Sequence, residues 1–448
     1  MRAYEGRDRA MAAVESALAH AAGADAAEAF LSVRAGEYTR FAGRRVHQPQ
    51  DIVERQLMVR VNVGGRTARA ATSDPAGAAR AVRAALDLAT SAGVIDVAEP
   101  QEYPELRLWH EDTAAWDVSA RSAEAARTMR AAEDAGALAY GMYGRAATEL
   151  AVANTAGLRA YACATEASGA LTVKAGDGSS YWCDLGRSAA ALDLPAAVAR
   201  TVAEGARSRT PAELPDGVHD VVLGPLAAGE LLHFFGAFGF TAEALGDGVG
   251  LAATSAGREL ASSLITVGDD ALAAEGLPFP FDFEGTAKRR VPFLSAGRVG
   301  EVVGDLATAA RLGVPSTGHA HIAREESPRA VPANLRLEPG GTSVEELIAG
   351  VEDGVYVQRF WYTRVVDPAA TTITGVSRDG CFRIRNGRLA GPVVGKRFTE
   401  SVLGVLSRVD AVGDTPATQP LMNVWNGCAT APALRVRGFR FGPAGGSR

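Results

Sequence analysis

The 448-residue sequence is short of lysine, cysteine and long apolar runs, and each shortage narrows the class of protein. Only three of its 46 basic residues are lysines, and the net charge of −6 offers no electrostatic footprint for nucleic acid. No run reaches the ~18 unbroken apolar residues of a membrane span. The first 16 residues mix acids and arginines without an apolar signal core, which makes the cytoplasm the expected location.

The four cysteines, Cys163, Cys183, Cys381 and Cys428, lie far apart and without CxxC spacing. In a chain of this size they indicate reduced, buried thiols rather than a disulfide framework. The length exceeds that of one compact core and predicts two domains, residues 1–215 and 216–448. The stretch 210–217, rich in proline, acid and glycine, is the predicted boundary.

The first half alternates helical and strand-like patterns. Apolar spacing predicts helices over 7–22, 75–91, 119–136 and 195–208, and strands over 26–33, 56–63, 67–72, 138–143, 149–154, 158–165, 170–174 and 180–185. Gly64-Gly65 predicts a hairpin turn, and Asp74 an N-cap.

The second half changes character. A strand over 218–223 and a strongly apolar helix over 225–239 precede mostly short β-like segments with glycine-rich turns. Asn386-Gly387 is the dipeptide that a type I′ hairpin turn prefers. The predicted fold class is α+β, with an N-terminal α/β domain of hairpins and helices and a C-terminal, mainly β domain with few helices.

Standard catalytic signatures are scarce. The sequence contains no GxSxG elbow and no P-loop. The glycine-rich stretch 246–251 lacks the last glycine of a dinucleotide fingerprint and favours a turn. A helical zinc site needs two histidines on one face, and the one His-Glu pair, His110-Glu111, has no second histidine after it and favours a surface position.

One histidine cluster stands out, because His319 and His321 fall on the same face of a predicted strand. Two ligands leave a metal site incomplete, so the pattern favours a structural or substrate-contacting role over a metal. Asp282 and Glu284 share a strand face in the same way. They suit acid–base work, but turn formation and pairing with Arg289 or Arg290 is the favoured role.

A series of short motifs runs through both halves. They occupy residues 57–63, 127–128, 149–158, 220–225, 281–286, 304–309, 316–320, 332–341, 345–348, 354–357, 386–387 and 431–436. In this order they resemble the TldD/PmbA family, also described as modulators of DNA gyrase, over nearly the whole chain.

The resemblance implies a heterodimer of a TldD-like and a TldE-like chain, in which the TldD-like chain binds a metal through an HExxxH helix and a later cysteine. Here the corresponding helix reads AGELLHFF over 228–235, with His233 and no HExxxH. The chain therefore resembles the TldE/PmbA side, with no catalytic residue or metal of its own and zinc or a similar divalent ion expected in the partner. Cys428 lies broadly where the relatives have their ligand cysteine, and a buried thiol is favoured over a ligand.

Three functions stay open at this stage. The first is the non-metal subunit of a cytoplasmic metallopeptidase, which encloses a small or unfolded peptide at the partner's metal site. The second is a TldE-like subunit of a pair that cleaves an amide bond in an antibiotic or other natural-product intermediate, and the third is a non-enzymatic assembly factor. The candidate substrate contacts are His319, His321, Tyr356 and Arg290, the last suited to bind a carboxylate bidentately.

Overall fold

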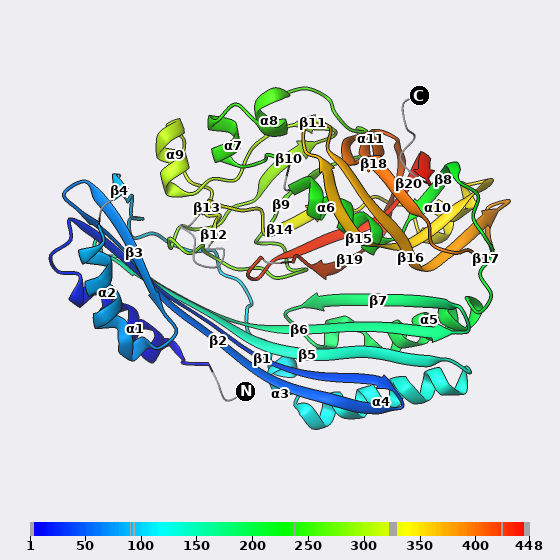
Figure 1. The fold of residues 1–448 in the computed structure, drawn as a ribbon, viewed down its shortest axis with the longest axis horizontal. Coiled ribbons are helices and arrows are strands. Elements are labelled where there is room, and N and C mark those ends of the chain that lie inside the picture. Colours follow the sequence, from blue (N-terminus) through cyan, green and yellow to red (C-terminus); the bar gives the residue numbers. More distant parts are fainter. Residues whose placement is uncertain are drawn as a thin grey trace.

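A computed structural model describes residues 4–89, 91–92, 95–236, 238–321, 329–422 and 424–442 (Figure 1). In these residues most strands belong to two large sheets, one from each half of the chain, and the second half lies over one face of the first sheet. The α+β class is confirmed. Among the same residues no helix has the length and apolar character needed to cross a membrane.

The first sheet is antiparallel, in the order β4-β3-β2-β1-β5-β6-β7. Its strands are β1 (Ala26–Gly43), β2 (Arg45–Val63), β3 (Arg66–Thr72), β4 (Ser91–Ala92), β5 (Leu138–Asn154), β6 (Arg159–Ala175) and β7 (Gly178–Gly186). The helices of this half are α1 (Arg7–His20), η1 (Pro75–Gly77), α2 (Ala78–Asp87), α3 (Glu111–Ala115), α4 (Val118–Asp134), η2 (Ala190–Leu192) and α5 (Leu194–Arg207). Helices α1, α2, α4 and α5 pack on one face of the sheet and leave the other face for the second half.

The strands of this sheet are longer than predicted. The predicted strands 138–143 and 149–154 are one strand, β5, because the residues between them pair with β1 on one side and β6 on the other. Gly144 lies in this central stretch, where a Cβ would come within 2.5 Å of the Tyr38 ring. Gly144 is therefore a packing requirement of a continuous strand.

Local turn and cap predictions are confirmed more closely. Gly64 and Gly65 join β2 to β3, and both have positive φ. Asp74 caps the first turn of η1, since its carboxylate accepts the Ala76 N–H at 3.0 Å. The helix predicted over 75–91 is shorter than expected, because α2 ends at Asp87 and residues 91–92 form β4.

The second sheet has the order β11-β10-β9-β14-β20-β18-β16-β15-β8, with β17 on β16 and β19 on β20. Its strands are β8 (Gly217–Leu223), β9 (Val267–Asp269), β10 (Val291–Ser295), β11 (Arg298–Val299), β14 (Asn334–Leu337), β15 (Asp353–Asp367), β16 (Thr372–Arg385), β17 (Arg388–Pro392), β18 (Arg397–Ser401), β19 (Val409–Pro420) and β20 (Cys428–Phe441); β12 (Ala320–His321) and β13 (Arg329–Ala330) form a separate pair. Because β8 also pairs with β20, five of these strands close into a ring.

Helices of the second half are short. They are α6 (Pro225–Gly236), α7 (Ala242–Gly246), α8 (Gly250–Thr254), α9 (Leu306–Leu312), α10 (Val344–Ala349) and α11 (Val402–Ser407). Helix α6, the predicted apolar helix, packs against β15, β19 and β20 in the largest hydrophobic core. Its burial explains the all-round apolar sequence that marked it.

The two halves meet through an aromatic layer. Phe279, Phe281 and Phe283 pack against apolar side chains on the helix-free face of the first sheet, and Phe283 meets Phe30 edge to face at 5.1 Å. The connecting segment is held as well, because Ala212 exchanges two backbone hydrogen bonds of 2.9 Å with the end of β17. The polar groups described next lie beside this layer.

Candidate functional site

Helix α6 is where the resemblance leads one to look for metal ligands. Aligning the glutamate of HExxxH with Glu230 puts Gly229 and Phe234 at the two histidine positions. Glu230 and His233 are half-buried on the same helix, and burial raises the pKa of Glu230 and lowers that of His233. A neutral imidazole next to the Phe234 ring, at 5.1 Å between centroids, is therefore the ionisation state that burial favours for His233.

The space beside Gly229 is filled. A Cβ at this position would lie 2.7 Å from Nε2 of Gln419 on β19, closer than side chains approach. The Gln419 amide in turn donates to the Leu226 carbonyl at 3.2 Å. An imidazole at position 229 would require Gln419 to move. With glycine and phenylalanine at the two histidine positions, the residues present on this helix do not supply the ligands of a bound metal ion.

His319 is enclosed in a buried polar network. Its Nδ1 lies 2.8 Å from the Thr317 carbonyl oxygen, and its Nε2 lies 3.1 Å from Oδ1 of Asp269, without the alignment of a good hydrogen bond. The other Asp269 oxygen accepts the backbone N–H groups of Ala333 and Asn334 at 2.6 and 2.9 Å. Burial acts to raise the pKa of Asp269, but His319, Lys288 and these donors outweigh it and the pKa falls below its usual value.

His321 and Cys428 belong to the same region. The Nε2 of His321 accepts the Trp425 N–H at 2.7 Å, and burial together with the charge of Lys288 lowers the pKa of His321 to about 4. Cys428 is buried, its sulfur lies 3.5 Å from the Asn334 amide nitrogen, and burial raises its pKa to about 11. A protonated thiol with a protein partner matches the favoured interpretation of Cys428.

Asp282 and Glu284 lie in a turn rather than on a strand face. Asp282 Oδ1 accepts the N–H groups of Glu284 and Thr286 at 3.0 and 2.9 Å, which confirms its predicted role in the turn. The predicted arginine partners are wrong. Glu284 pairs with Arg60 of β2 at 3.1 Å, and Arg60 also pairs with Glu28 of β1 at 2.7 Å.

Arg289 and Arg290 point to other carboxylates, which explains that error. Arg289 pairs with Glu301 at 2.7 Å, and Arg290 with Glu338 and, at 3.9 Å, with Asp270. The half-exposed Arg290 guanidinium therefore already has carboxylate partners within the chain. Proximity in sequence predicted the wrong partner for Glu284, because its buried partner, Arg60, comes from the other sheet.

Tyr356 lies in a different part of the second half from the histidines. Its ring is buried with Val222 and Phe382, and its hydroxyl donates to Gln358 at 2.5 Å. Burial raises its pKa. The structure thus connects His319 to Cys428 through Asp269 and Asn334, and His321 shares with them only the charge of Lys288. Tyr356 and Arg290 lie outside this group, and the role of all four candidate contacts in binding substrate stays a prediction.

Sequence reasoning missed three charged groups in this region, the buried Asp269 and Arg187 and the half-buried Lys288. Arg187 lies in the first half and donates to the carbonyls of Thr165 at 3.0 Å and Pro278 at 2.7 Å, so it ties the two halves together. Nothing in the local sequence marks these positions, since their partners lie far away along the chain. Across the described ranges, no three His, Cys, Asp or Glu side chains converge closely enough to hold a metal ion.

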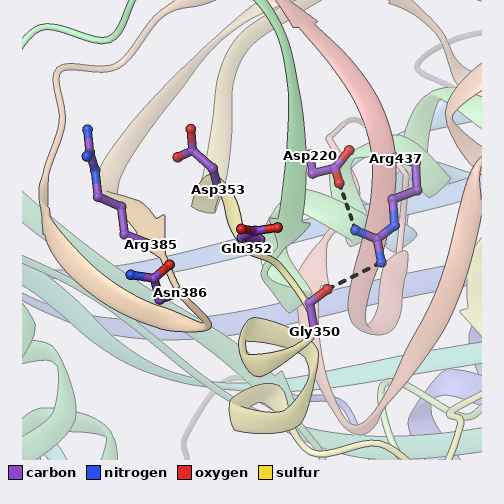
Figure 2. A pocket seen from close by; sticks show the side chains of 7 residues that line it. All are labelled: Asp220, Gly350, Glu352, Asp353, Arg385, Asn386 and Arg437. Carbon is purple, nitrogen blue, oxygen red and sulfur yellow. Dashed lines mark hydrogen bonds and ion pairs between the residues drawn. The ribbon is translucent and has the colours of Figure 1, made fainter.

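A wide polar hollow of about 650 Å³ opens on the second half (Figure 2). Figure 2 shows Arg437 between Asp220 and the Gly350 carbonyl on one side, with Arg385 and Asn386 opposite. Arg437 donates to Asp220 at 2.7 Å and to Gly350 at 3.3 Å, so these groups satisfy one another. The side chains that line the hollow are half-exposed or exposed, and the hollow lies on different strands from the histidines.

The fold and site define a two-part α+β protein whose apolar helix carries a glutamate without flanking histidines. The sequence model of the PmbA/TldA metallopeptidase C-terminal domain matches residues 216–443, and that of domain 1 of the same family matches 27–89. Since the first of these spans more than half of the chain, the protein belongs to the PmbA/TldD metallopeptidase family.

Individual relatives agree with this assignment. A metalloprotease of Methanothermobacter thermautotrophicus is 29% identical over 201 residues, which are 44% of this chain and 43% of that protein. A metalloprotease TldD homologue of Buchnera aphidicola is 26% identical over 207 residues, 45% of this chain and 42% of that protein. The matched part is therefore less than half the length of these relatives. The crystal structure of TldE from Thermococcus kodakarensis shares the fold, with a TM-score of 0.85 and 18% identity over 95% of this chain and 99% of the other.

Proposed function

We propose that this chain is the non-metal subunit of a heterodimeric metallopeptidase and helps to enclose a peptide at the metal site of a TldD-like partner. The observation that carries the proposal is helix α6. Gly229 and Phe234 stand where two histidines would flank Glu230, and Gln419 fills the space beside Gly229. Membership of a metallopeptidase family supports the reaction class, and the likeness in fold to a TldE supports the choice of subunit.

The division of labour follows from the chemistry. Zinc or a similar divalent ion in the partner would lower the pKa of its bound water and polarise the scissile carbonyl. This chain would contribute walls and backbone edges that hold an extended peptide. The proposed substrate is a small or unfolded peptide in the cytoplasm; an amide bond in an antibiotic or other natural-product intermediate is the alternative substrate.

Reconstitution tests the proposal. The chain is purified alone, together with a TldD-like chain from the same genome, and as the separate partner, and each preparation is assayed for bound metal and for hydrolysis of an unfolded peptide. We expect copurification, full activity only in the pair, and metal that follows the partner. Hydrolysis at full rate by this chain alone, with one equivalent of zinc, would refute the proposal, and a stable homodimer indifferent to the partner would favour the non-enzymatic alternative.

His319, His321, Tyr356 and Arg290 enter the proposal as residues that shape the peptide-binding side of the chain. The test uses His319→Ala and His321→Ala in the reconstituted pair, with thermal unfolding as the check on folding. A rise in KM is the expected result. Because both side chains are buried and hydrogen-bonded, thermal stability should also fall, so activity is compared below the unfolding temperature of each variant. Unchanged turnover by both variants would remove the histidines from the proposal.

A further inference from the structure

A second cavity, of about 490 Å³, lies between the two halves of the chain. One wall is the helix-free face of the β6–β7 hairpin, where Thr172, Lys174 and Ser179 lie side by side in the strand register. The other wall comes from β16 and the segment that follows β17. Small-ligand sites have volumes of this order and concentrate at the interfaces between domains.

The floor of this cavity is a buried carboxylate that joins the two walls. Asp379 accepts the Ser179 hydroxyl at 2.5 Å across the interface and the Arg359 Nε–H at 2.9 Å. Its backbone is left-handed, with φ of +52°, a conformation that aspartate tolerates better than most residues. Only 2% of the Asp379 side chain is exposed, so the charged floor is fixed.

The charges around this floor do not balance. Asp379 alone faces two guanidinium groups, those of Arg359 and, at 3.2 Å, Arg378. Lys174 adds a third cation at the exposed rim, where it makes no ion pair with any described residue, and Asp177 adds one more carboxylate. Among the charged side chains that line the cavity, Lys174 and Arg378 face Asp177 and Asp379. Since Arg359, behind the lining, also neutralises Asp379, an anionic ligand is favoured at Lys174 and Arg378.

Aliphatic side chains also line the cavity, beside Ser208 and Ser377. They are Val376, Val393, Val394, Pro211 and Pro392. A bare inorganic anion would leave this surface uncovered, whereas an aliphatic group would bury it. We propose that the cavity binds the C-terminal residue of a peptide, with its carboxylate at Lys174 and Arg378 and its aliphatic side chain against the valines.

The proposal goes beyond the pairing with a metal-bearing subunit, because every group that it uses belongs to this chain. Isothermal titration calorimetry on the full chain therefore tests it without the partner. The probes are N-acetyl-valyl-valine, the same dipeptide with an amidated C-terminus, and inorganic phosphate. We expect the acid to bind at least tenfold more tightly than the amide and than phosphate. Equal affinity for acid and amide, tighter binding of phosphate, or no heat from the acid would each overturn the proposal.

Variants locate the binding. Lys174→Gln removes the charge but keeps a polar, exposed side chain, and it should weaken binding of the acid by roughly fivefold. The matched control is Arg130→Gln, at an exposed arginine on α4, which should leave the affinity unchanged. Thr172→Phe fills the cavity from a strand that suits aromatic residues and should abolish binding. Wild-type affinity in both cavity variants would place any binding elsewhere; if Thr172→Phe does not fold, Lys174→Gln decides alone.

Discussion

Replacing Glu284 with glutamine should remove a pH dependence of folding that the wild-type chain carries. Glu284 and Glu28 share the single guanidinium of Arg60, at 3.1 and 2.7 Å, and both carboxylates are buried between the two halves. Burial, with Asp282 and Glu28 adding to it and Arg60 opposing, raises the pKa of Glu284 from 4.5 to about 8. One buried cation for two carboxylates therefore keeps a proton on the site at neutral pH.

The sign of the effect follows from the direction of the shift. The folded state binds the Glu284 proton more tightly than the unfolded state, so stability is fully present below pH 4.5 and falls as the pH rises through about 8. With these two pKa values, the free energy of unfolding should fall by about 2.5 kcal/mol between pH 6 and pH 9 through this group alone. In Glu284→Gln the group does not titrate, and Glu28 keeps Arg60 to itself.

Urea unfolding at pH 6 and pH 9 measures the effect. The change in the free energy of unfolding between the two pH values should be about 2.5 kcal/mol larger in the wild type than in Glu284→Gln. Glu301→Gln, at a half-exposed glutamate of the same half, is the control and should behave as the wild type. An equal pH dependence in the wild type and Glu284→Gln would show that Glu284 does not hold the proton and would refute the reasoning.

Two further predictions concern buried groups that the function does not explain. Arg187→Ala should lower the free energy of unfolding by about 3 kcal/mol, because it leaves the Thr165 and Pro278 carbonyls without their donor. The control, Arg298→Ala at an exposed ion pair, should lower it by less than about 0.5 kcal/mol. Equal losses of free energy in the two variants, measured by urea titration, would contradict this prediction. Cys428, with a buried sulfur and a pKa of about 11, should resist a thiol reagent at pH 7.5 until the chain is unfolded, and rapid labelling of the native chain at Cys428 in a peptide map would count against its burial.

Much of the fold could be predicted because its signals are local. The Asn386-Gly387 turn has φ of +48° and +71°, the left-handed pair that the type I′ hairpin needs, and its sequence alone identifies it. The apolar run of α6 is equally local. Strand ends were harder, since β5 continues through Gly144 by pairing with strands on both sides, and the Tyr38 ring leaves no room there for a side chain.

The buried charges could not be predicted for the opposite reason. Arg60 lies in an ordinary strand pattern among many other arginines, and its partner Glu284 is 224 residues away. Proximity in sequence suggested Arg289 instead, which lies on the surface and pairs with Glu301. A pairing between two sheets depends on how the halves dock, and no spacing rule within one segment reports that geometry.

Helix α6 has one feature that the sequence predicts and one that depends on packing between distant segments, and together they lead to a last prediction. The absence of HExxxH can be read from the sequence, but the filling of the space beside Gly229 by Gln419 cannot. Gly229→His should therefore lower the free energy of unfolding by about 2 kcal/mol or more, because its side chain must displace a packed amide. Gln419→Ala in the same chain should recover at least about 1 kcal/mol of that loss, a coupling that a double-mutant cycle in urea measures. If the changes in the free energy of unfolding of the two single variants simply add, Gln419 does not fill the site. The absence of the histidines would then affect only the metal ligands and not the packing of the core.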